Sequence, residues 1–201
     1  MDEFITSKEI IQYLDSNYNY KDTLSNLSSN KLIKSTEQAY DYDKIKNVVY
    51  KGNCASCDAL LIKKNINIIE FKTGFDSPDD TLDDKTKKEN LMLKIRLKAY
   101  ESLHLLYTAI IEEIDSTRKI QPKKIFCAVI DTNEMVTSEE AIVDILSEEG
   151  AVKNNSSYKT RIIENMLTMY RKETNHKKKL FYDDTFVLYD YEFDSNVNRF
   201  K

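Results

Sequence analysis

Two apolar segments joined by a short polar turn constrain the fold of this chain most strongly. Residues 57–63 (CDALLIK) and 66–72 (INIIEFK) have the length and the branched apolar content of buried strands, and the KKN turn between them makes a hairpin. Side chains alternate between the two faces of a strand, so Glu70 and Lys72 share one face of the second strand. The opposite faces are apolar as well, which predicts that both sides of this sheet are covered.

The hairpin carries three charges that are costly to bury without partners, on Asp58, Glu70 and Lys72. Two carboxylates that meet at one end of a sheet can hold a hard divalent cation, because Mg²⁺ binds a few carboxylate oxygens together with waters and phosphate oxygens. The backbone carbonyl of Phe71 is a further candidate ligand. Lys72 is placed to orient a water molecule or to stabilise charge on a phosphate oxygen. The pattern therefore predicts metal-assisted hydrolysis of a phosphodiester.

The remaining segments predict an α/β chain, because helical and strand patterns follow one another along it. The sequence TSKE, from Thr6 to Glu9, is typical of a capping box and predicts the start of a first helix. A chain of 201 residues fits a single domain, whose core we place at about 30–131. The other predicted elements are a weaker helix or two over 20–43, strands at 47–50 and 124–131, a long helix at 87–114, helices beginning near 138 and 157, and a strand-like run at 184–193.

Composition narrows the class of protein. The net charge of −4 argues against binding nucleic acid through overall basicity, although local basic runs remain candidates for contact. We expect a cytoplasmic protein without a membrane partner, because no signal peptide and no apolar run of membrane-spanning length is evident. Cys54, Cys57 and Cys127 are expected to be reduced thiols, since an odd number does not suggest a disulfide scaffold and the ligand spacing of a zinc site is missing.

The motif in the hairpin resembles that of the PD-(D/E)xK nuclease superfamily, which has the restriction-endonuclease-like fold. Asp58 is followed twelve residues later by Glu70, Phe71 and Lys72 on the next predicted strand, and Cys57 stands where many members carry proline. The resemblance implies a mixed central sheet in the order α-β-β-β-α-β, flanked by helices, with terminal additions. It implies Mg²⁺ or Mn²⁺ bound at Asp58, Glu70 and Phe71, a catalytic role for Lys72, and DNA rather than RNA as the substrate.

The long predicted helix supplies candidate substrate-binding residues. Members similar to the RecB-type nucleases carry a Gln-xxx-Tyr motif there, and Arg96 and Tyr100 have the same spacing in this chain. Apolar residues lie within about 60° of Arg96 on a helical projection, which predicts that Arg96 faces inward and Lys98 and Glu101 face solvent. An inward guanidinium needs an anionic partner, either a carboxylate of the protein or a phosphate.

The resemblance also implies an acidic residue on the first core helix. Glu37 is the best-placed candidate for this catalytic role, ahead of Asp41 and Asp43. We expect a homodimer or a protein partner to supply specificity.

Two other interpretations stay open. The chain can be a module that keeps the nuclease fold without catalysis and binds nucleic acid or protein, which the acidic net charge favours. Alternatively the match is accidental, and Asp58 and Lys72 form an ordinary ion pair at the ends of a surface hairpin.

Overall fold

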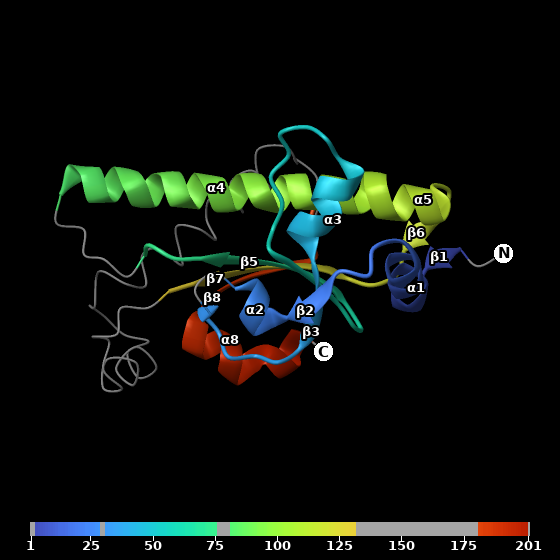
Figure 1. Ribbon diagram of the computed structural model, residues 1–201, viewed down its shortest axis with the longest axis horizontal. Helices are drawn as coiled ribbons and strands as arrows, with labels where there is room; N and C mark the ends of the chain where they lie inside the picture. Colours follow the sequence, from blue (N-terminus) through green and yellow to red (C-terminus); the bar gives the residue numbers. More distant parts are fainter. Residues whose placement is uncertain (1–2, 29–30, 76–80, 132–180, 201) are drawn as a thin grey trace.

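A six-stranded mixed sheet forms the centre of the computed structural model, with helices against both of its faces (Figure 1). The structure describes residues 3–28, 31–75, 81–131 and 181–200. The strand order is β2-β3-β4-β5-β7-β8; pairs from β2 to β5 are antiparallel, and β5, β7 and β8 are parallel. The strands are β2 (Lys21–Thr23), β3 (Gln38–Asp41), β4 (Ala59–Ile62), β5 (Ile66–Lys72), β7 (Lys124–Ile130) and β8 (Asp184–Tyr189). The mixed α/β class predicted from the sequence is therefore confirmed.

The longest helix lies along one face of the sheet, and the C-terminal helix lies against the other (Figure 1). The helices are α1 (Ser7–Asn17), α2 (Leu24–Leu27), α3 (Tyr42–Val49), α4 (Leu82–Leu106), α5 (Glu112–Asp115) and α8 (Asp190–Asn196). A π-helical turn, η2 (Tyr107–Ile111), joins α4 to α5, and a 3₁₀ turn, η3 (Val197–Phe200), follows α8. Two short strands, β1 (Phe4–Ile5) and β6 (Lys119–Ile120), pair in parallel outside the main sheet. No described helix has the length and apolar character needed to cross a membrane.

The sheet separates two apolar cores. On the α4 side, Leu60 and Ile68 pack in one cluster with Ile95 and Ala99 of the helix. On the other side, a second cluster joins the strands to α8 and η3 through Ala59, Leu61, Ile69, Phe193 and Phe200. Both faces of the hairpin are thus buried, as its apolar pattern predicted, and no side chain in the middle of β5 faces bulk water.

Four predicted elements agree closely with the structure. The hairpin is β4 and β5, the strand at 124–131 is β7, and the long helix is α4, η2 and α5 in succession. The first helix begins at its predicted capping box, in which the Thr6 amide donates to Glu9 Oε2 at 2.9 Å and the Glu9 amide donates to Thr6 Oγ1 at 3.4 Å. Local patterns of side chains determine these elements, and for this reason the sequence predicts them.

Other predictions were wrong. Segment 20–43 was expected to hold a helix or two, but apart from the short α2 and the start of α3 it forms β2 and β3, because these strands pair with each other and β3 pairs with β4. Segment 47–50 was expected to be a strand, but it ends α3, whose first turn is capped by the Asp41 side chain accepting from the Lys44 amide.

The C-terminal end of the described chain also differs in part from its prediction. Residues 184–193 form β8 and the start of α8, so the sheet extends beyond the core predicted at about 30–131. The helices expected near 138 and 157 fall outside the described residues.

Removing the Glu9 carboxylate tests the first helix cap. The hydrogen bond from the Thr6 backbone, and then the Arg118 guanidinium, lower the pKa of Glu9 to about 2. A carboxylate whose pKa is lower in the folded than in the unfolded chain stabilises the fold above its unfolded pKa, and this contribution is lost as the pH falls through the folded value. Glu9→Gln should therefore lower the melting temperature at pH 7, with a difference from wild type that shrinks between about pH 4.5 and pH 2. The exposed Glu112→Gln is the control variant, and an equal Glu9→Gln difference at all pH values would contradict the role of the cap.

Candidate active site

Asp58 and Glu70 lie opposite each other where the hairpin of β4 and β5 meets helix α4. Leu60 pairs with Ile68 in this hairpin, so continuing the register by two residues places position 58 opposite position 70. The backbone amide of Phe71 donates a hydrogen bond to Asp58 Oδ2 at 2.7 Å, which orients that carboxylate. The structure thus brings together the two acidic residues that the sequence singled out.

A lysine from α4 lies between these two carboxylates. Lys98 Nζ is 2.8 Å from Glu70 Oε2 and 3.3 Å from Asp58 Oδ1. The side chain of Glu70 is 0% exposed, that of Asp58 14% and that of Lys98 23%, so this is a largely buried group of charges. Burial opposes the ammonium form, but the two carboxylates outweigh it and raise the pKa of Lys98.

The position of Lys98 corrects the expected orientation of the long helix. Its buried stripe runs through Met92, Ile95, Ala99, Ser102, Leu103 and Leu106, and Lys98 lies on one flank of this stripe. Leu93 is one of the apolar residues within about 60° of Arg96 on a helical projection and was therefore expected to face inward, but it is 54% exposed. Glu101, expected in solvent, accepts a hydrogen bond from the amide of Ala55 in the loop before β4. The sequence signal for this orientation is the i, i+4, i+7 spacing of Ile95, Ala99 and Ser102, which places Lys98 at the edge of the buried face.

Glu70 is the most unusual group of the site. One carboxylate oxygen receives the Lys98 ammonium, whereas Oε1 is buried without a hydrogen-bond partner. Burial raises the pKa of Glu70, and the charge of Asp58 adds to this, to about 8; Lys98 acts in the opposite direction. Because a buried polar atom without a partner costs free energy, this oxygen indicates a place where a cation or a water molecule can bind.

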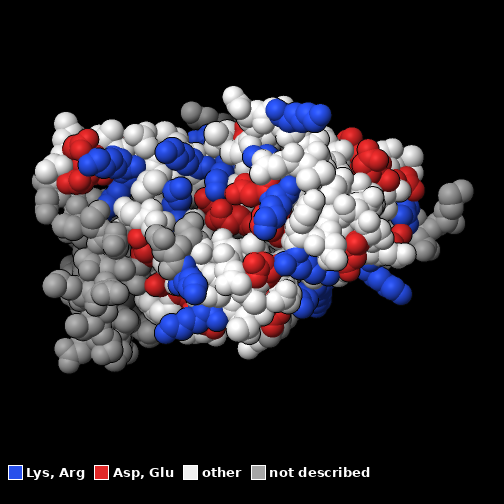
Figure 2. Space-filling model, in the orientation of Figure 1, with Lys and Arg blue, Asp and Glu red and all other residues white. Residues whose placement is uncertain are grey.

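A third carboxylate lies nearby on α3. Burial raises the pKa of Asp58, and the charge of Asp43 adds a smaller increase. Asp43 Oδ1 also accepts a hydrogen bond from the Ser56 hydroxyl, in the loop that leads to Asp58. Figure 2 shows acidic atoms in a hollow beneath α4, with basic side chains around it. On this face, acidic side chains are therefore surrounded by positive charge.

The donor set around Glu70 suits a hard cation. Among the described residues, no three His, Cys, Asp or Glu side chains form a ready metal cage. Protein ligands would come from Asp58 and Glu70, with the Phe71 carbonyl as a candidate. Two carboxylates completed by waters are a set that Mg²⁺ accepts, because it keeps several waters when bound to proteins.

Glu37 lies away from this acidic group. It precedes β3 instead of lying on a helix, and its Oε2 is 3.5 Å from Nζ of Lys63, at the far end of β4. The sequence ranked Glu37 above Asp43, and the structure reverses that order. Glu37 was expected to lie on a helix, but the residues that follow it form β3, which pairs antiparallel with β4.

Arg96 and Tyr100 also lie away from the acidic pair. Each is two residues from Lys98 on α4, and residues two apart on a helix are separated by about 200°. The ring of Tyr100 packs edge-to-face on Phe181, with centroids 5.0 Å apart. On α4 these two predicted substrate-binding residues therefore point to a different side of the helix from Lys98.

Lys72 is half-buried at the end of β5. It follows Glu70 by two residues on the same face, and its charge lowers the pKa of Glu70 slightly against the larger effect of burial. The alternative in which Asp58 pairs with Lys72 on a surface hairpin is not observed: within the described ranges Asp58 pairs with Lys98.

The loop that carries Asp58 is tied to α4. The amide of Cys57 donates to Ser102 Oγ at 2.7 Å, and the Tyr42 hydroxyl donates to the Ser102 carbonyl at 2.9 Å. All three cysteines are unpaired, as expected, and burial raises the pKa of the Cys57 thiol. The loop therefore places Asp58 by hydrogen bonds and packing, without a disulfide.

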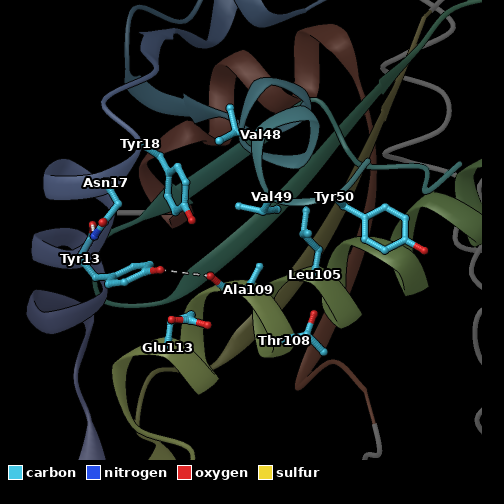
Figure 3. A pocket seen from close by; sticks show the side chains of 10 residues that line it. All are labelled: Tyr13, Asn17, Tyr18, Val48, Val49, Tyr50, Leu105, Thr108, Ala109 and Glu113. Carbon is cyan, nitrogen blue, oxygen red and sulfur yellow. Dashed lines mark hydrogen bonds between the residues drawn. The ribbon is translucent and has the colours of Figure 1, made fainter. Parts of the chain in front are cut away.

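A second hollow lies between α1, α3 and the end of α4 (Figure 3). Its volume is about 510 Å³, and its lining residues are Tyr13, Asn17, Tyr18, Val48, Val49, Tyr50, Leu105, Thr108, Ala109 and Glu113. None of these residues is basic, so the hollow offers no charged partner to a phosphate. It contains neither carboxylate of the acidic pair.

Replacing Glu70 tests the electrostatic state of the site. The pKa of Glu70 is higher in the folded chain, at about 8, than its ordinary value of 4.5, so the fold retains a proton that the unfolded chain has lost between these values. Stability is therefore lost as the pH rises through this window. Glu70→Gln has no such group, and its melting temperature relative to wild type should increase from pH 5 to pH 8. A constant or shrinking difference would contradict the raised pKa; Glu112→Gln is the matched exposed control.

Comparisons with known proteins give no guide to the role of these residues. A scan against protein-family models, and searches of curated proteins and of solved structures, found no match to this chain. Asp58, Glu70, Lys72 and Lys98 must therefore be interpreted from their own geometry and charge.

Proposed function

We propose that this protein is a nuclease of the PD-(D/E)xK type that uses Mg²⁺ or Mn²⁺ to hydrolyse phosphodiester bonds of DNA. The observation that carries the proposal is the buried pair of Asp58 and Glu70, in which one Glu70 oxygen has no partner. Buried carboxylates with raised pKa values are frequent at functional sites, because structure alone gains little from them.

The residues around the pair support a hydrolytic role. Asp58 is oriented by the Phe71 amide, and Glu70 is enclosed by the α4 side of the sheet, so both ligands are held before a metal arrives. A bound divalent cation would lower the pKa of a water molecule and offset charge on the phosphate. Lys72 lies at the half-buried rim of the same face, where an ammonium can orient the water or stabilise the developing charge.

The arrangement of strands supports the same family. Strands β3, β4 and β5 are antiparallel neighbours, α4 follows β5, and β7 returns parallel to it. This agrees with the β-β-β-α-β part of the expected core, with α3 inserted between β3 and β4. We therefore include the restriction-endonuclease-like fold in the proposal.

A module without catalysis is the second candidate, favoured by one specific observation. The Lys98 ammonium already compensates the two carboxylates, so the group of charges can be stable in the absence of a metal. In that case the protein would bind DNA or another protein and would leave phosphodiesters intact.

Lys72→Ala tests the catalytic proposal directly. We expect cleavage of DNA in Mg²⁺ or Mn²⁺ to fall by at least about 100-fold, since a residue that transfers or orients a proton contributes that much. The melting temperature should stay near that of wild type, because Lys72 is only half-buried. The measurement is the rate at which single- and double-stranded DNA and RNA are cleaved by wild type and variant. The control is Lys64→Ala, which replaces an exposed lysine in the hairpin turn. Full activity of Lys72→Ala would remove the central role of this lysine.

Asp58→Ala separates the two candidates. A nuclease should lose both Mn²⁺ binding, measured by calorimetry, and cleavage in this variant. Unchanged DNA binding by Asp58→Ala, together with no metal uptake by wild type, would instead favour the module without catalysis.

A further inference from the structure

Lys98 occupies the position between Asp58 and Glu70 in which a cation is required. Its Nζ lies within hydrogen-bond distance of both carboxylates, and it reaches them from α4, an element that carries neither. An ammonium is a compact point charge with three donors, so it can substitute electrostatically for an inorganic cation. On a helical projection it lies between the buried Ser102 and Leu105 at the edge of the buried face of α4, so the packing of the helix brings Lys98 to the pair.

We propose that Lys98 is a built-in cation that holds the Asp58–Glu70 pair when no metal is bound, and that a divalent ion must displace it. The inference rests on the proposed metal-dependent function and adds a means of regulating the same site. Removing one partner of a buried group of charges leaves the others uncompensated, so the ionised pair needs a cation. The ammonium and the metal therefore compete for the same oxygens.

Two features permit the exchange. The Lys98 side chain is 23% exposed, so its flexible stem can turn the ammonium toward solvent without moving the helix. Glu70 Oε1 has no hydrogen-bond partner, so an arriving ion has a ligand atom available before the ammonium leaves. Glu70 Oε2 and Asp58 Oδ1, which Lys98 now contacts, become available when it departs.

Competition of this kind lowers the apparent affinity for metal. For an ion that must displace an internal partner, the apparent dissociation constant is the intrinsic one divided by the fraction of time that the site is open. Metal binding would then depend on the position of one lysine, and a phosphate that attracts the displaced ammonium would favour the metal-bound state. DNA and metal would therefore strengthen each other's binding.

The first test compares Mn²⁺ binding by wild type and Lys98→Met, measured by calorimetry on the full chain. Methionine keeps an apolar stem of similar length and removes the competing charge. We expect the dissociation constant for Mn²⁺ to fall by at least about tenfold. Lys94→Met, an exposed lysine one turn earlier on α4, should bind like wild type.

The second test uses the wild-type protein, so that it stands even when Lys98→Met does not fold without metal. An amine-reactive reagent should modify Lys98 faster in saturating Mn²⁺ than without metal, with Lys94 as the internal reference in mass spectrometry. Bound Mn²⁺ with unchanged Lys98 reactivity would overturn the displacement.

The outcomes distinguish this inference from the proposed function. Equal Mn²⁺ affinities for wild type and Lys98→Met would overturn displacement while leaving a metal-dependent nuclease in place. Binding by Lys98→Met alone would support displacement in its strongest form. No Mn²⁺ binding by either protein, with both folded, would overturn the inference and the metal-dependent function together.

Discussion

A buried carboxylate in the central strand is the constraint on which the site depends. Glu70 has no exposed surface and is flanked by β4 on one side and β7 on the other, so bulk solvent does not compensate its charge. Its hydrogen-bonding cation comes from α4, through Lys98. The position of α4 across the sheet is therefore coupled to the charge of β5, because a buried charge without a partner is strongly destabilising.

The same helix also organises the loop that carries Asp58. Ser102 accepts from the Cys57 amide, and Glu101 accepts from the Ala55 amide. Lys98, Glu101 and Ser102 thus contact the hairpin and its loop from a single surface of α4. A change in the tilt or register of this helix would disturb the acidic pair and its loop at once, which makes the helix the rigid support that a preorganised site requires.

Expectations drawn from the sequence were accurate where local chemistry decides the outcome. The capping box at Thr6 and Glu9 and the alternation of β4 and β5 are local, and the structure contains them. Expectations were inaccurate where pairing between distant segments determines the secondary structure. Residues of β3, for example, were expected to be helical, but they form a strand that pairs with β4. Propensity is a weak guide there, because a neighbouring strand supplies hydrogen bonds that a short polar segment cannot form alone.

The sequence by itself determined that Asp58 and Glu70 lie on paired strands and that these two strands are buried on both faces. Only the tertiary structure decided which residues meet them: Lys98 instead of Arg96, and Asp43 instead of Glu37. The physical reason is that the face a helix turns toward a sheet depends on the apolar surface it covers in three dimensions. On α4 several apolar side chains remain exposed, so counting them along the sequence placed the centre of the buried face too close to Arg96.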